Sequence, residues 1–82
     1  MNTNTFLITV ADALGVDSSE ISVDSTQEEL EEWDSLGHLA ILQALDEVCG
    51  GKLDQVSGLG AMTSLRSIWA ALEAAGLANS AD

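Results

Sequence analysis

The chain has 82 residues, and its 14 acidic residues outnumber its two basic ones, which gives a formal net charge of −12 at pH 7. A chain this short buries only about 60% of the surface that its unfolded form exposes, which leaves room for one domain and disfavours a deep catalytic cleft. The charge disfavours nucleic acid and anionic membranes as partners and favours basic protein surfaces, while a hydrophobic fraction of 46% argues against disorder.

A first helix is predicted from about residue 5 to residue 14. The chain contains no proline, and leucine and alanine dominate its apolar residues, which favours helices. Phe6, Val10 and Leu14 recur every four residues and would therefore share one face of a helix. Gly15 follows at a position where helices commonly end, so we expect the helix to stop there.

Residues 16–34 form a long, mainly polar connection without a helical period. Residues 17–20, Asp-Ser-Ser-Glu, have the spacing of a local capping turn, and Ile21 and Val23 alternate as buried anchors of a loop would. A connection of this length usually carries function, contains a short helix of its own or is disordered. The apolar residues within it disfavour disorder.

The second helix is the most strongly patterned part of the chain. Asp34 is a favourable N-cap, and Gly50 and Gly51 mark the end of the helix. Between them, apolar residues recur at helical spacing: Leu36, Leu39, Ile41, Leu42, Leu45, Val48 and Cys49.

The last third of the chain predicts one short turn and one further helix. Residues 52–56 are expected to form a short extended link, and residues 57–62 have room for a single helical turn. Thr63 is expected to cap a helix that runs to about Ala75 and ends at Gly76. Four apolar residues would form the inner side of this helix: Leu65, Ile68, Trp69 and Leu72.

These elements predict an all-α protein, a small four-helix bundle of three main helices and one short helical turn, with a long loop between the first two helices. Residues 1–82 are expected to form one domain, with its core at about residues 5–77 and a frayed tail over residues 78–82. No apolar run approaches the roughly 18 residues of a membrane span, and residues 1–5 lack the basic start of a signal peptide. We therefore expect a cytoplasmic protein.

Groups that could perform catalysis or bind a metal are scarce. His38 and Cys49 are the only histidine and the only cysteine, and they lie too far apart along a helix to share an ion. Ser35 and His38 would be neighbours on a helix, but no glycine-flanked serine turn or oxyanion hole accompanies them. The acidic residues 24–34 lack the pattern of a calcium loop. The sequence predicts neither an enzyme nor a metal site, and a serine hydrolase stays only as a hypothesis to test.

Residues 31–39, Glu-Glu-Trp-Asp-Ser-Leu-Gly-His-Leu, are the most informative stretch. They place Ser35 in the first turn of a helix, directly after the capping Asp34. Unpaired N–H groups and the positive end of the helix dipole favour a bound or attached anion at such a place. The pattern therefore suits a serine that carries a phosphodiester; the simpler alternative is that both residues only start the helix.

At this point the chain resembles the acyl carrier protein family over residues 6–77. The resemblance rests on Asp34-Ser35-Leu36 at mid-chain, the long loop before it, the apolar helix after it and the Thr-Ser-Leu start of the last helix at residues 63–65. It implies a four-helix fold in which Ser35 carries 4′-phosphopantetheine, transferred from coenzyme A by a phosphopantetheinyl transferase. It also implies that the protein catalyses nothing itself and presents an acyl group as a thioester to partner enzymes.

The resemblance assigns further roles around the serine. Asp34 and Leu36 would help to present Ser35 and its arm, and His38 is close enough to contact the arm or its phosphate, although a packing role is the simpler interpretation. Five residues would contact partner proteins: Glu31, Glu32, Asp34, Leu36 and Leu39.

The acids are unevenly placed, and this bears on the pathway. Seven of the 14 lie in residues 20–34, directly before Ser35, whereas the second helix holds only Asp46 and Glu47, with Gly37 and Ala40 where carriers of fatty acid synthesis usually have acids. This disfavours docking onto the enzymes of fatty acid synthesis. The Trp-Asp-Ser-Leu-Gly-His form of residues 33–38 resembles freestanding carriers of specialised pathways, such as polyketide, aminoacyl or saccharide-modifying systems. The chain's expected partners are a loading ligase or acyltransferase and a downstream synthase or transferase, and we expect it to be a monomer. The alternatives are an aminoacyl or peptidyl carrier and a small acidic interaction module without a prosthetic group.

Four other side chains carry specific expectations. Trp33 is interpreted as a hydrophobic staple at the entry to the helix, with a partner contact as the alternative. Trp69 is expected in the core, and Cys49 as a small buried apolar group. Arg66, one of only two cations, is expected to pair with an acid.

Overall fold

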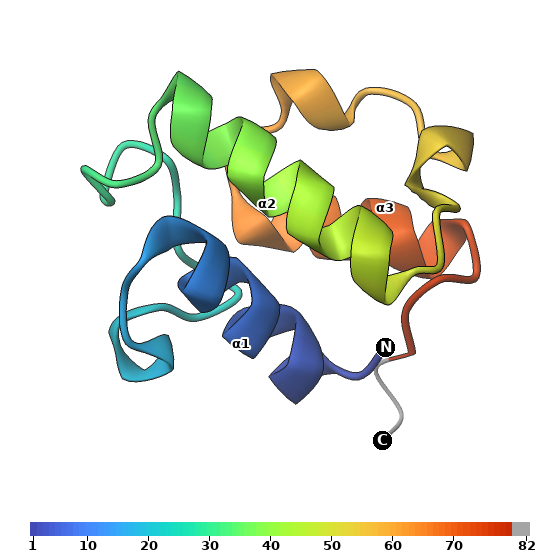
Figure 1. The fold of residues 1–82 in the computed structure, drawn as a ribbon, viewed down its shortest axis with the longest axis horizontal. Helices are drawn as coiled ribbons and strands as arrows, with labels where there is room; N and C mark the ends of the chain where they lie inside the picture. Colours follow the sequence, from blue (N-terminus) through green and yellow to red (C-terminus); the bar gives the residue numbers. More distant parts are fainter. Residues whose placement is uncertain (80–82) are drawn as a thin grey trace.

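The computed structural model describes residues 1–79. Within these residues the chain forms three α-helices and three short 3₁₀ turns, and no strand beyond one isolated bridge between Thr26 and Ser64. Figure 1 shows the elements in chain order: α1 (Thr3–Leu14), η1 (Ser18–Glu20), α2 (Ser35–Val48), η2 (Leu53–Gln55), η3 (Leu59–Ala61) and α3 (Leu65–Ala74). The predicted all-α class is confirmed for this part of the chain, with three main helices as expected.

Helix α1 follows its predicted pattern closely. It begins at Thr3, two residues earlier than expected, because the side chain of Asn2 accepts a hydrogen bond from the Thr5 N–H at 2.8 Å and caps the helix. Gly15 ends it in a left-handed conformation, with φ of 74°. The buried face contains the three predicted residues and one more: Phe6, Val10, Leu14 and Ala11.

The long connection begins with the predicted capping turn. Asp17 and Glu20 form a reciprocal capping box around η1. Hydrogen bonds from the backbone N–H and the hydroxyl of Ser19 hold the pKa of Asp17 below its ordinary value. Ile21 is buried as predicted, whereas Val23 is only half-buried.

The same connection is tied to the start of α3. The Gln27 N–H donates to the Thr63 carbonyl at 2.7 Å, and the Leu65 N–H donates to the Ser25 carbonyl at 3.0 Å. Arg66 pairs with Asp24, so the expected ion pair is present; both side chains are largely exposed, and such a pair contributes little to stability. The two backbone hydrogen bonds therefore do more to fix the loop that leads to α2.

Helix α2 has one buried face and one that faces solvent. His38, Ile41 and Leu45 point into the core, while Leu36 and Leu39 leave 77% and 63% of their surface exposed. The predicted apolar pattern thus covers two faces rather than one. The exposed leucines lie in the first two turns of the helix.

The segment after α2 differs in part from the sequence prediction. The extended link expected at residues 52–56 is wrong: the segment forms η2, because the Asp46 side chain accepts a hydrogen bond from the Leu53 N–H at 3.0 Å. The single turn expected at residues 57–62 is confirmed as η3. Helix α3 is capped by Ser64 and not by Thr63, whose carbonyl is engaged by the loop.

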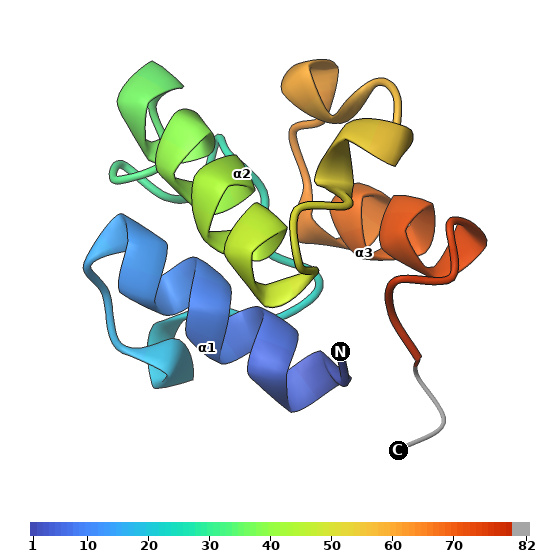
Figure 2. The ribbon, with the colours of Figure 1, turned by 45° about the vertical axis from the view of Figure 1, so that its right-hand side comes forward.

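The core is built from residues of all three helices, whose arrangement Figure 2 shows, and of the segments between them. Its largest fully buried side chain is Trp33, followed by Phe6 and five aliphatic residues of α2 and α3, Ile41, Leu45, Leu65, Ile68 and Leu72. Trp69 is in the core as predicted and lies against Phe6, with ring centroids 5.0 Å apart. Among the described residues, no helix has the length and apolar character needed to cross a membrane.

The two ends of the described chain lie side by side (Figure 1). The Asn79 N–H donates to the Met1 carbonyl at 2.9 Å, and Ala78 packs against the core. The frayed tail predicted from residue 78 is therefore wrong at its first two positions, because both are held. Its remaining positions, residues 80–82, lie outside the described residues.

Candidate functional site

Ser35 is the first residue of α2, and its side chain is exposed. The Asp34 carboxylate accepts a hydrogen bond from the Gly37 N–H at 2.8 Å and so caps the helix as predicted. The N–H groups of Ser35 and Leu36 donate to no acceptor in residues 1–79. The hydroxyl therefore lies beside two free N–H donors at the positive end of the α2 dipole.

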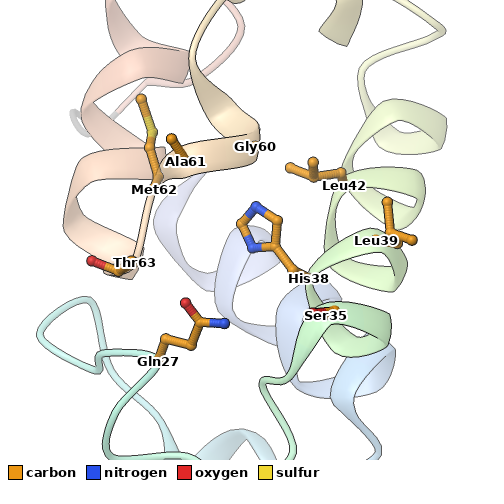
Figure 3. A pocket seen from close by; sticks show the side chains of 9 residues that line it. All are labelled: Gln27, Ser35, His38, Leu39, Leu42, Gly60, Ala61, Met62 and Thr63. Atoms are coloured by element: carbon orange, nitrogen blue, oxygen red, sulfur yellow. The ribbon is translucent and has the colours of Figure 1, made fainter.

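An open pocket of about 360 Å³ adjoins Ser35 (Figure 3). It lies between the first turns of α2 and the segment that contains η3, and Gln27 closes its lower side in the view of Figure 3. Among residues 1–79 its lining carries no charged side chain and consists of Gln27, Ser35, His38, Leu39, Leu42, Gly60, Ala61, Met62 and Thr63. An uncharged chain with a few amide groups would fit such a lining.

His38 is buried beside this pocket, with 8% of its surface exposed. Its Nδ1 lies 2.9 Å from the Trp33 indole nitrogen, and its Nε2 lies 2.8 Å from the Leu59 carbonyl oxygen. Because a carbonyl only accepts, Nε2 donates; because an indole N–H only donates, Nδ1 accepts. The ring is therefore the uncharged Nε2–H tautomer. Neither nitrogen bonds to Ser35, so the serine–histidine pair of a hydrolase is not assembled.

Trp33 forms the predicted hydrophobic staple. Its indole stacks on the imidazole of His38, four residues into the helix, with centroids 5.9 Å apart and an angle of 9° between the planes. Only 1% of its surface is exposed. The alternative role of Trp33 as a partner contact is therefore wrong, because the side chain is inside the core.

Gly37 has a packing role that sequence reasoning missed. A methyl group at this position would clash with the Glu32 carbonyl oxygen and lie 3.0 Å from Cδ2 of Leu14. The interpretation of Gly37 as a surface position that lacks an acid is therefore wrong. Only a residue without a side chain fits between α2 and the chain that leads into it.

The predicted partner residues gather around Ser35. Leu36 and Leu39 are the most exposed large apolar residues of the described chain. The acids predicted with them, Glu31, Glu32 and Asp34, are also exposed. The structure thus brings two leucines and three carboxylates to one end of α2, next to the serine.

No known protein family, curated protein or solved structure matches the chain. The assignment of the site therefore depends on these residues and their geometry. The pocket residues that sequence reasoning missed, Gln27, Thr63 and residues 60–62, come from two segments far apart in the chain. Backbone hydrogen bonds between them, Gln27 to Thr63 and Leu65 to Ser25, bring these segments together, and no local sequence pattern predicts this pairing.

Cys49 lies at the end of α2, half-buried, and does not line the pocket. Burial raises the pKa of its thiol; the Asp46 carboxylate acts in the same direction, and the N-terminal ammonium opposes both. Because the thiolate is the reactive form, a raised pKa makes this thiol a poor nucleophile at neutral pH.

We therefore expect Cys49 to react with iodoacetamide at pH 7 several-fold more slowly in the native protein than in urea, as followed by intact mass. The difference should shrink as the pH is raised, since the thiolate fraction then increases in the native protein. Equal rates in native and unfolded protein at pH 7 would contradict the burial of this thiol.

Proposed function

We propose that this protein is an acyl carrier, which holds an acyl intermediate as a thioester on a 4′-phosphopantetheine arm attached to the Ser35 oxygen. One observation carries the proposal: an exposed serine hydroxyl at the first position of a helix, beside two free N–H groups and an open, uncharged pocket. The resemblance of the sequence to carrier proteins agrees with it.

The residues at the site fit such an arm. The N–H groups of Ser35 and Leu36 and the helix dipole favour the negative charge of a phosphodiester. The arm beyond the phosphate is uncharged and contains amides, and the pocket offers Gln27 and Thr63 as polar partners among apolar side chains. When attached, the group supplies a terminal thiol that activates an acyl chain as a thioester.

The rest of the surface fits repeated, reversible docking. The exposed Leu36 and Leu39 provide apolar contact area, and the exposed acids directly before Ser35, Glu31, Glu32 and Asp34, add negative charge at the same end of α2. A net charge of −12 steers the protein toward basic faces of partner enzymes without making the complexes tight. A phosphopantetheinyl transferase, a loading ligase or acyltransferase and a downstream synthase or transferase would share this surface.

The decisive measurement is the intact mass after incubation with coenzyme A, Mg²⁺ and a broad-specificity phosphopantetheinyl transferase. We expect a gain of one phosphopantetheine per chain, no gain in Ser35→Ala, and an unchanged gain in Ser57→Ala, which alters another exposed serine. The product should also contain one thiol that reacts rapidly at pH 7, in contrast to Cys49. No gain in the unaltered protein, or an equal gain in Ser35→Ala, would contradict the proposal.

The exposed leucines also favour a second candidate, an acidic interaction module without a prosthetic group. This module would bind its partners equally well with Ser35→Ala, whereas a carrier would lose its cargo with that change. An aminoacyl or peptidyl carrier would share the arm and differ only in what a loading enzyme attaches to it. Loading assays of the modified protein with amino acids and with acyl donors separate these two carriers.

A further inference from the structure

His38 joins three segments that are separate in the chain. It projects from α2, accepts the Trp33 N–H of the preceding loop and donates to the Leu59 carbonyl at the start of η3. Within the described residues, the bond to Leu59 is the only hydrogen bond that connects residues 57–62 with another segment; the others there are local. The imidazole is therefore the one polar anchor of this segment, beside the packing of the Leu59 and Met62 side chains against the core.

This segment forms one wall of the pocket beside Ser35. Gly60, Ala61 and Met62 directly follow the bonded carbonyl and line the pocket opposite α2 (Figure 3). Gly58, just before it, has φ of 82° and no side chain that could anchor the turn. The wall is thus a short turn with a single polar anchor.

We propose that His38 is a positioning residue that acts as an uncharged latch: it fixes η3 beside the start of α2, and uptake of a proton by its ring opens the pocket next to Ser35. The latch is independent of any group that Ser35 carries.

The hydrogen bonds explain why a proton would open the latch. Nδ1 is free of a proton because it accepts from the Trp33 indole, which has no lone pair to offer in return. A proton on Nδ1 would place two donors against each other and a positive charge in a buried site. Imidazole is the side chain that takes up a proton between neutral and mildly acidic pH.

Within the described residues, no charged side chain bonds to the ring or lines the pocket. The ring is bonded by an indole from the loop and a carbonyl from η3, and the pocket it borders contains only uncharged polar groups, from Gln27, Ser35 and Thr63. On its own helix, the adjacent carboxylate of Asp34 is engaged by the Gly37 N–H. The protonated ring would be hydrated if it moved out of its buried site into solvent, and this movement would also break the hydrogen bond to the Leu59 carbonyl.

Two substitutions separate the two bonds. In His38→Asn the amide oxygen can take the place of Nδ1 and accept from Trp33, but the side chain is too short to reach Leu59. In His38→Gln the amide nitrogen can take the place of Nε2 and donate to Leu59, but the acceptor for Trp33 is lost. Neither side chain titrates, so the position of η3 should not depend on pH in either variant.

The experiment measures amide hydrogen exchange of residues 57–62 between pH 7.5 and pH 5, after correction for the intrinsic exchange rates. The NMR signal of the Trp33 indole N–H is followed over the same range. In the unaltered protein we expect ¹⁵N spectra to show the Nε2–H tautomer at pH 7.5, and exchange of this segment to become roughly tenfold faster as the pH falls. In His38→Asn, exchange of residues 57–62 should be fast at every pH, and the Trp33 indole signal should be retained. In His38→Gln, exchange of these residues should stay slow at every pH, and the Trp33 indole signal should be shifted. The Trp69 indole signal should not change with pH.

Exchange in the unaltered protein that does not depend on pH, or an Nδ1–H tautomer at pH 7.5, would overturn the proposal. So would slow exchange of residues 57–62 in His38→Asn. If both variants fail to fold, the tautomer and the pH dependence of the unaltered protein still decide the matter.

Discussion

Replacing Trp33 by alanine is expected to lower the free energy of unfolding by about 3–5 kcal/mol, because the change removes the largest fully buried side chain and leaves a cavity in the core. A domain of 82 residues has a total stability of roughly 4–12 kcal/mol, so the variant would be close to unfolding at room temperature. Urea denaturation followed by far-UV circular dichroism measures the loss.

Trp33→Phe separates the packing of this side chain from its hydrogen bond. The aromatic ring stays, but the buried Nδ1 of His38 loses its donor, which costs about 1–3 kcal/mol. Trp69→Phe is the matched control, because Trp69 is also buried and its indole N–H has no hydrogen-bond partner within residues 1–79. We expect a smaller loss for Trp69→Phe. A Trp33→Ala variant within about 0.5 kcal/mol of the unaltered protein would show that the staple is not part of the core.

Much of the helical framework was predictable because the signals that set it are local. The Asp34 side chain caps α2 and Gly15 ends α1, and each acts within one turn of its own position. The four-residue spacing of Phe6, Val10 and Leu14 likewise predicts which face of α1 is buried. Such signals require no knowledge of the rest of the chain.

The details of the site could not be predicted, since they depend on contacts between distant segments. Whether His38 faces Ser35 or the core is decided by the Leu59 carbonyl, 21 residues away. The extended link expected after α2 became η2 because Asp46 reaches forward to the Leu53 N–H. A carboxylate on a helix gives no sign in the sequence that it will cap the next turn.

The packing of Gly37 and the cap made by Asp46 bear on the uneven distribution of acids. In helix α2 an acid cannot replace Gly37, which is packed against the preceding chain, and one of its two acids, Asp46, is engaged in a cap. The carboxylates of Glu31, Glu32 and Asp34 instead lie at the exposed N-terminal end, around Ser35. In the proposed carrier, the negative charge would therefore guide partners to the serine itself rather than along the length of the helix.

Gly37→Ala is expected to reverse the usual effect of adding a methyl group to a helix. In an ordinary helix interior, alanine is favoured over glycine by roughly 0.5–1 kcal/mol. Here the methyl group would clash with the Glu32 carbonyl oxygen and press on Leu14, so the backbone before α2 must shift. We expect the variant to be less stable than the unaltered protein by about 1–3 kcal/mol, as measured by urea denaturation.

Gly60→Ala provides the control for this change. A methyl group at Gly60 meets no atom within 4 Å, and its φ does not lie in the left-handed region, so stability should stay within about 0.5 kcal/mol. If Gly37→Ala instead raised stability, the Glu32 carbonyl would not be held against α2. If it lowers stability as expected, Gly37→Ala should also gain phosphopantetheine more slowly than the unaltered protein under conditions where both are folded, because the clash displaces the chain that positions Ser35.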